Sequence, residues 1–171
     1  MSSQWIDVAA TSGGKYGAYL SLPPAGKGPG LVLFQEIFGV NRHIRAVADQ
    51  YALDGFVVLA PDLFWRDAPR VELGYEGAER ERALVLMKGA DPKLLAEDIK
   101  TTVAALRARP ETVGKVHGLF KSPLPKLHGR VCECLAVDIG IIRICPFIIP
   151  RPVRLRHVRQ ECVLIRLVVE Q

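Results

Sequence analysis

Apolar residues in the first two thirds of the chain gather in short runs separated by longer amphipathic stretches. Residues 15–22 alternate between apolar and polar positions, which predicts a strand that ends at the Pro23-Pro24 pair. Residues 31–34 and 56–60 are continuous apolar runs bounded by turn residues, a pattern typical of strands buried on both faces of a parallel sheet. We therefore expect at least three strands before residue 61.

A helix is predicted between the second and third of these runs. Asn41 is a suitable N-cap and Gly55 a suitable stop, because these residue types fit the two ends of a helix. Apolar residues between them recur at the spacing of one helix face: Ile44, Val47, Ala48, Tyr51 and Ala52. The order strand, helix, strand predicts a βαβ unit.

Two further helices and a fourth strand are expected before residue 117. A short helix covers residues 79–87 and ends at Gly89, and a longer one starts at Asp91-Pro92 and stops at Pro110. The strand that follows opens near Val116. The buried stripe of the longer helix is predicted to be Leu95, Ile99, Val103 and Leu106. The pattern predicts an α/β fold with a doubly wound, mostly parallel sheet that is incomplete after this strand.

The composition changes after Val116. The first 116 residues hold 14 basic and 14 acidic side chains, whereas residues 117–171 hold 9 and 4, so the whole net charge of +5 comes from the tail. Seven of eleven isoleucines and all four cysteines also lie there. We interpret residues 1–116 as one part of a domain and residues 117–171 as an unrelated basic tail, which we expect to pack irregularly because its local signals conflict.

The basic tail raises two alternatives, nucleic-acid binding and a metal site. Its arginines are scattered among aliphatic residues and prolines without an aromatic platform, so we predict no specific nucleic-acid partner. A zinc site built from cysteines and His157 is disfavoured, because the 132–134 pair is closer than usual zinc ligands and has no matching second pair. We expect reduced thiols, no metal and no cofactor. The cysteines concerned are Cys132, Cys134, Cys145 and Cys162.

Neither a targeting signal nor a membrane helix is predicted. The first seven residues lack the basic and apolar segments of a secretory signal. The most apolar stretch, residues 134–150, is interrupted by Asp138, Arg143 and Pro146, so it is too short to span a bilayer. We expect a cytoplasmic protein with no membrane partner. The pattern gives no oligomeric state.

The string Gln-Glu-Ile-Phe-Gly-Val-Asn at residues 35–41, placed directly after a buried strand, resembles the dienelactone hydrolase family, which has the α/β-hydrolase fold. Three further segments keep the order and spacing of that family: residues 60–64, the helix that contains Arg80, and residues 98–116. The resemblance covers about two thirds of this chain and half of a full-length member. It implies hydrolysis of a cyclic enol lactone through a cysteine nucleophile, with a small lactone or ester as the partner.

The resemblance implies roles for three residues. Glu36 corresponds to a glutamate that lies beside the catalytic thiol and accepts its proton, although a loop glutamate also commonly caps a helix or stays solvated. The backbone N–H of Ile37 corresponds to half of the oxyanion hole. Arg80 corresponds to an arginine that holds the substrate carboxylate, and the alternative is an ordinary charge on a helix surface.

The segment that carries the nucleophile in this family has no counterpart here. After Val116 the family continues with a Gly-x-Cys-x-Gly elbow, but no Gly-x-[Ser/Cys]-x-Gly sequence occurs anywhere in this chain. Ser122 lies near the expected place and is followed by proline, which has no N–H for an oxyanion hole. We do not assign triad roles to Asp138, His128 or His157. The simplest hypothesis is a frameshift after codon 116, which would account for the composition, the missing elbow and the length together.

Two functions follow from the sequence. The first is a carboxylic ester hydrolase of dienelactone hydrolase type that is inactive in this chain because its nucleophile elbow is missing. The alternative is a non-catalytic binding protein that keeps the Glu36 and Arg80 side of the pocket and associates through its basic tail. Thiol-sensitive ester hydrolysis distinguishes the two.

Overall fold

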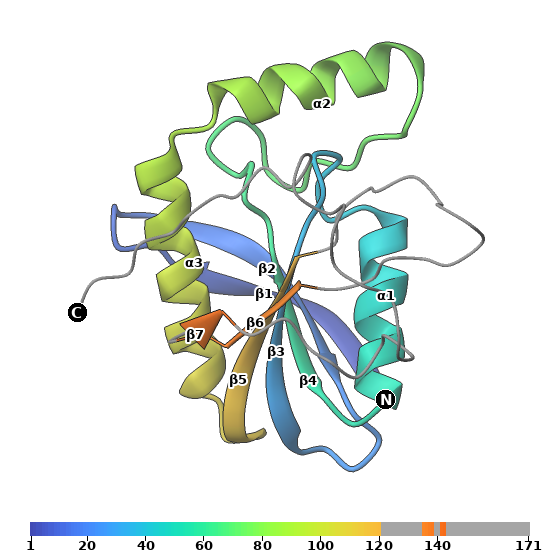
Figure 1. The fold of residues 1–171 in the computed structure, drawn as a ribbon, viewed down its shortest axis with the longest axis vertical. Coiled ribbons are helices and arrows are strands. Elements are labelled where there is room, and N and C mark those ends of the chain that lie inside the picture. Colours follow the sequence, from blue (N-terminus) through green and yellow to red (C-terminus); the bar gives the residue numbers. More distant parts are fainter. Residues whose placement is uncertain (121–134, 139–140, 143–171) are drawn as a thin grey trace, which may run out of the picture.

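The computed structural model describes residues 1–120, 135–138 and 141–142, which form a seven-stranded sheet and three helices (Figure 1). The helices are α1 (Arg42–Leu53), α2 (Gly77–Gly89) and α3 (Pro92–Arg107). The strands are β1 (Ser2–Ala9), β2 (Lys15–Leu22), β3 (Gly28–Phe34), β4 (Val57–Pro61), β5 (Thr112–Phe120), β6 (Leu135–Asp138) and β7 (Ile141–Ile142).

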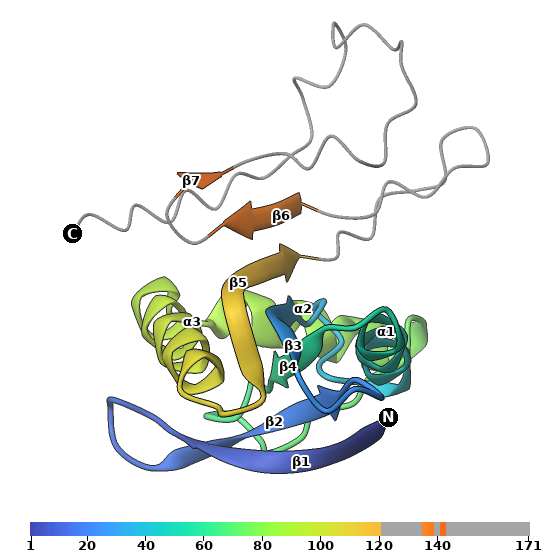
Figure 2. The same ribbon diagram turned by 90° about the horizontal axis from the view of Figure 1, so that it is seen from below.

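The sheet has a parallel centre and antiparallel edges. Its strand order is β1-β2-β4-β3-β5-β6-β7, and β3 runs parallel to both β4 and β5. The remaining neighbours pair antiparallel, and Figure 2 shows β6 and β7 continuing the sheet beyond β5. The predicted α/β fold class is confirmed, with a mixed sheet in which only the centre is parallel.

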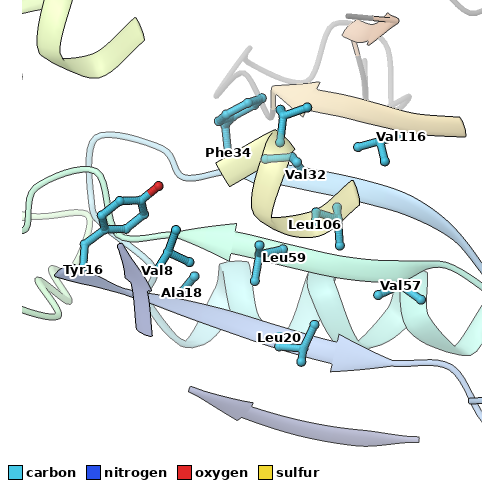
Figure 3. Close-up of a cluster of buried hydrophobic side chains, with 11 residues drawn as sticks. Val8, Tyr16, Ala18, Leu20, Val32, Phe34, Val57, Leu59, Leu106 and Val116 are labelled. Carbon is cyan, nitrogen blue, oxygen red and sulfur yellow. The ribbon is translucent and has the colours of Figure 1, made fainter. Parts of the chain in front are cut away.

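The two faces of the sheet bury alternate residues of the same strands. On β3, Val32 and Phe34 belong to a core covered by α3, while Leu31 and Leu33 belong to a second core covered by α1. Side chains of successive strand residues point to opposite faces, so the continuous apolar run of β3 fills both cores. Figure 3 shows the first core, where residues of five strands meet Leu106 of α3. Helices on both faces make the fold doubly wound.

The predicted element ends are confirmed where local rules set them. The predicted first strand matches β2 residue for residue. Asn41 caps α1, because its side-chain oxygen accepts the N–H of Ile44 at 3.1 Å, and Asp91 caps α3 through the N–H of Lys93 at 2.8 Å. The strand expected near Val116 begins earlier, at Thr112, and continues to Phe120, so residues 117–120 belong to the sheet.

A buried polar network joins α3 to β2 and to the loop after β4. The carboxylate of Asp98, only 1% exposed, forms an ion pair with Arg66 and accepts the indole N–H of Trp65 at 3.0 Å. The hydroxyl of Tyr16 donates to the backbone oxygen of Asp98 at 3.0 Å and contacts the hydroxyl of Thr102 at 2.7 Å. Burial raises the pKa of Tyr16 to about 12, so this phenol stays neutral and donating at neutral pH.

Most of the tail predicted at residues 117–171 lies outside the described residues. All four cysteines, Ser122, His128 and His157 fall there, so the expectations about thiols, metal ligands and packing of the tail stay predictions. Within the described helices, none is long and apolar enough to cross a membrane.

Candidate functional site

The loop that follows β3 starts at the edge where the three parallel strands end. Phe34, the last residue of β3, pairs with Phe120, the last residue of β5. The side-chain oxygen of Gln35 accepts the N–H of Leu63 at 3.0 Å and so ties this loop to the one after β4. Ligand sites of open α/β sheets lie outside the carboxyl ends of their strands. This edge is therefore the candidate site.

Glu36 is half-buried in this loop and faces Tyr75. The Tyr75 hydroxyl donates to Oε2 of Glu36 at 3.3 Å, and the backbone oxygen of Glu36 accepts the N–H of Gly39 at 3.3 Å in a tight turn. The cap of the adjoining helix is Asn41, so Glu36 is not a helix cap. No described residue donates to the other carboxylate oxygen, Oε1.

Gly39 allows the segment at residues 71–75 to lie against this loop. Its φ of +80° is in the left-handed region, and a Cβ at this position would lie 1.9 Å from the backbone oxygen of Val71. The N–H of Leu73 donates to the backbone oxygen of Phe38 at 2.9 Å, and Gly39 forms a β-bridge with Glu72. A side chain at position 39 would separate the two segments.

Asn41 joins the loop that carries Glu36, the segment at residues 71–75 and the start of α1 through hydrogen bonds. Asn41 is buried, with 7% of its surface exposed. Its side-chain oxygen accepts the N–H of Ile44 and caps α1. Its side-chain amide donates to the backbone oxygen of Leu73 at 3.3 Å and to the Tyr75 hydroxyl at 3.5 Å. The sequence predicted the cap and missed the contacts to Leu73 and Tyr75. These contacts join residues more than thirty positions apart, which helix rules do not address.

A shallow open depression of about 570 Å³ lies at the start of α1, and Glu36 itself does not line it. Tyr75 lines it and contacts Glu36, so the depression and the Glu36 loop share one wall. Glu72 forms an ion pair with Arg45, and Glu79 accepts the N–H of Gly74 at 2.9 Å, so two carboxylates of its wall are engaged. Arg42 and His43 also line it.

A second carboxylate supports the loop after β4. Asp62 is buried at the end of β4 and accepts the N–H groups of Phe64 at 3.1 Å and Arg70 at 2.6 Å. Burial raises the pKa of Asp62 above its usual range, while these two N–H groups and the charge of Arg70 offset part of the increase. Its bonds hold the loop in which Leu63 meets Gln35.

Arg80 is exposed on α2 and is not joined to Glu36 by any contact among the described residues. Of the thirteen residues of α2, Ala83 alone is buried; Ala83 and the half-buried Leu86 pack on a small cluster that includes Phe38, while Val85 is 69% exposed. Ile37 is half-buried, and its backbone N–H donates to no other described residue. The substrate-binding role of Arg80 and the oxyanion role of Ile37 stay predictions.

The described residues contain no group of three or more His, Cys, Asp or Glu side chains placed to hold a metal ion. The site residues that sequence analysis missed are Gln35, Asn41 as a donor, and Tyr75. Two of them lie in the string at residues 35–41 on which the family resemblance rests. Tyr75 carried no signal in the sequence, because it reaches Glu36 from a loop 39 positions away.

Comparison with known proteins gives one consistent result. Residues 16–119 match the model of the dienelactone hydrolase family. Carboxymethylenebutenolidase 1 from Cupriavidus pinatubonensis is 37% identical over 117 residues, which cover 68% of this chain and 50% of that protein. Carboxymethylenebutenolidase from a Pseudomonas species is also 37% identical over 117 residues, 68% of this chain and 49% of that protein.

The chain thus spans about half the length of the curated relatives it matches. A solved structure of a candidate dienelactone hydrolase from Klebsiella pneumoniae has a TM-score of 0.53 and 22% identity, covering 69% of this chain and 50% of that chain. At this identity the similarity shows the fold alone.

Proposed function

The chain belongs to the dienelactone hydrolase family, and on this premise we propose that its first 120 residues form the substrate-positioning half of a carboxylic ester hydrolase site for cyclic enol lactones. The observation that carries the proposal is the half-buried Glu36 carboxylate at the edge where the parallel strands end. Because Phe34 pairs with Phe120, β5 ends beside the start of the loop that holds Glu36. In this family the nucleophile elbow follows that strand.

Glu36 is proposed to act on the nucleophile rather than on the substrate. A carboxylate within reach of a thiol accepts its proton, and the thiolate is the form that attacks an ester carbonyl. Tyr75 engages Oε2 of Glu36, while Oε1 has no donor among the described residues. The open Oε1 is therefore the atom proposed to accept the proton.

Ile37 and Arg80 are proposed to contact the substrate. The N–H of Ile37 has no acceptor among the described residues and comes directly after Glu36, which suits one donor of an oxyanion hole. Arg80 is exposed on α2, and its planar guanidinium can bind a substrate carboxylate with two hydrogen bonds.

We propose that the chain, with the sequence printed above, does not turn over dienelactones. Its sequence contains no Gly-x-[Ser/Cys]-x-Gly elbow after β5 or elsewhere. Nucleophile, base and orienting group act as a unit, so removal of the nucleophile alone abolishes most of the rate acceleration. Half an oxyanion hole and a positioned carboxylate contribute little without it.

Hydrolysis assays on the full chain test this proposal directly. We expect the rates on a dienelactone and on nitrophenyl acetate to equal those in buffer, before and after treatment with a thiol-alkylating reagent. Turnover that alkylation abolishes would contradict the proposal and place a nucleophile among the four cysteines. Binding of the lactone without turnover would favour the alternative, a binding protein.

A chimera tests the roles of the individual residues. Replacing the residues after Val116 with the corresponding half of an intact relative should restore turnover, and Glu36→Gln in that chimera should lower kcat on both substrates. Arg80→Ala should raise KM for the dienelactone and leave nitrophenyl acetate unaffected, because only the first substrate has a carboxylate. An equal change in KM for both substrates in Arg80→Ala would contradict the proposal that Arg80 binds the substrate carboxylate.

A further inference from the structure

Tyr75 lies where the loop after β4 meets the loop that carries Glu36. Its hydroxyl donates to Oε2 of Glu36 at 3.3 Å, and no described residue donates to Oε1. We propose that Tyr75 is a positioning residue that holds the Glu36 carboxylate in one orientation, with Oε2 occupied and Oε1 directed to the reacting group. This inference rests on the proposed function, because that function makes the orientation of Glu36 matter.

The Tyr75 ring is held from two sides by residues of the 35–41 string. The rings of Tyr75 and Phe38 pack in a tilted arrangement with centroids 4.4 Å apart. The amide of Asn41 approaches the Tyr75 hydroxyl at 3.5 Å and also donates to the backbone oxygen of Leu73, two residues earlier. Phe38 and Asn41 thus fix Tyr75, and Tyr75 in turn fixes Glu36.

The backbone beside Tyr75 is fixed as well. The N–H of Leu73 donates to Phe38 at 2.9 Å, and the N–H of Gly74 donates to the Glu79 carboxylate at 2.9 Å. Tyr75 is nevertheless 47% exposed, so its ring fills little of the core. Its contacts are therefore better suited to directing a neighbouring side chain than to stabilising the fold.

The length of the hydrogen bond between Tyr75 and Glu36 also favours a positioning role over a role in stabilising the fold. At 3.3 Å the contact is longer than the usual 2.7–2.8 Å of a hydroxyl bond, which limits its contribution to stability. A weak bond still selects among side-chain rotamers, because these differ little in energy when a glutamate is free. Burial raises the pKa of Tyr75, and the charge of Glu36 and its hydrogen bond raise it further, so the hydroxyl keeps its proton at neutral pH.

The test measures the rotamers of Glu36 in the isotope-labelled full chain through three-bond NMR couplings. In the wild type we expect one dominant rotamer, and in Tyr75→Phe we expect couplings averaged over several staggered rotamers. Tyr19→Phe is the matched control, because the Tyr19 hydroxyl also donates to a carboxylate, that of Asp49, and its ring also packs against an aromatic ring, that of Trp5. Unchanged Glu36 couplings in a folded Tyr75→Phe variant would overturn the proposal.

A second variant keeps the proposal open to refutation if Tyr75→Phe does not fold. In Glu36→Gln, the pKa of Tyr75, followed through its Cζ signal, should fall, because both the charge of Glu36 and its hydrogen bond raise it. An unchanged Tyr75 pKa would show that the two side chains do not interact. Neither measurement uses a substrate, so the result is independent of whether the ester assays support the proposed function.

Discussion

The loop at residues 35–41 and helix α2 carry the two predicted side chains of the site, Glu36 and Arg80, and they are held in different ways. The loop is bonded to its surroundings through Gln35, Phe38 and Asn41, each of which contacts a segment distant in sequence. Helix α2 buries only Ala83 and has no side-chain bond at its N-cap. The predicted Glu36 side of the site is therefore built into the sheet edge, while the predicted Arg80 side lies on a lightly packed helix.

This difference has a consequence for chemistry. Under the proposed function Glu36 accepts a proton and must be held within hydrogen-bond reach of its partner, and the bonds of the loop limit its movement. A long arginine side chain tolerates more movement of its backbone when it binds a substrate carboxylate. The proposed roles therefore combine a rigid proton acceptor with an adaptable substrate contact.

Gly39→Ala should produce the largest loss of stability among the changes made in the Glu36 loop and in α2. The left-handed backbone costs a non-glycine residue about 1–2 kcal/mol, and the new Cβ also meets the backbone oxygen of Val71 at 1.9 Å. Overpacking of this kind adds about 1–3 kcal/mol. We expect a loss of about 3 kcal/mol in the free energy of unfolding, measured by urea denaturation.

Gly77→Ala in α2 is the control for that measurement. Gly77 also has a positive φ, +56°, but a Cβ there meets nothing within 4 Å. Its cost should be limited to the backbone strain, about 1–2 kcal/mol. Equal losses at positions 39 and 77 would show that the segment at residues 71–75 is not held against the Glu36 loop.

Asn41→Ala should have the next largest effect. The variant loses the cap of α1 and the bond to Leu73, and the loss of a cap alone costs about 0.5–2 kcal/mol. Glu76→Ala at the N-cap of α2 is the matched control, because Glu76 makes no cap bond and its removal should change stability by less than about 0.5 kcal/mol. A similar melting temperature for both variants would contradict the comparison of the two regions.

The buried Asp62 should make the loop side sensitive to pH. Its folded pKa is raised above the ordinary value of 3.8, so above that pH the unfolded chain loses the proton first and unfolding becomes easier. The contribution to stability is therefore complete at low pH and is lost as the pH rises through the folded pKa. Asp62→Asn, which does not titrate, should lack this loss.

Urea denaturation of both proteins from pH 3 to pH 7 measures the effect. The side-chain amide that replaces the carboxylate in the variant leaves one of the two N–H groups without an acceptor, which adds an offset that does not depend on pH. The difference in unfolding free energy between wild type and variant should fall as the pH rises. A difference that rises with pH would mean that the two N–H bonds outweigh burial at this carboxylate.

Local rules explain which parts of the fold were predictable from the sequence. The ends of β2, the cap at Asn41 and the cap at Asp91 depend on neighbouring residues alone, and all three were predicted. The edge strand β1 was missed because its side chains are mostly exposed, so its residues show no apolar alternation. Asp98 and Thr102 are buried polar residues of α3, and the apolar stripe gave no indication of them.

The candidate site was predictable only from residues 35–41, whose sequence resembles the dienelactone hydrolase family. Glu36 was identified from the resemblance, whereas Tyr75 and the contacts of Asn41 to Leu73 depend on a loop that packs from elsewhere in the chain. That packing requires the left-handed turn at Gly39 and the close approach of Val71, neither of which follows from local spacing. Contacts between distant segments are thus the part that the sequence pattern did not reveal.

Arg80→Ala should have the smallest effect on stability. Arg80 is exposed and forms no ion pair with another described residue, and surface changes of this kind alter stability by less than about 0.5 kcal/mol. Arg66→Ala is the matched control, because it removes the partner of the buried Asp98 and leaves that charge uncompensated. The control should lower the melting temperature clearly, while Arg80→Ala leaves it unchanged. A loss at Arg80 comparable to that at Arg66 would mean that Arg80 is part of the packing of α2 rather than a side chain available to a substrate.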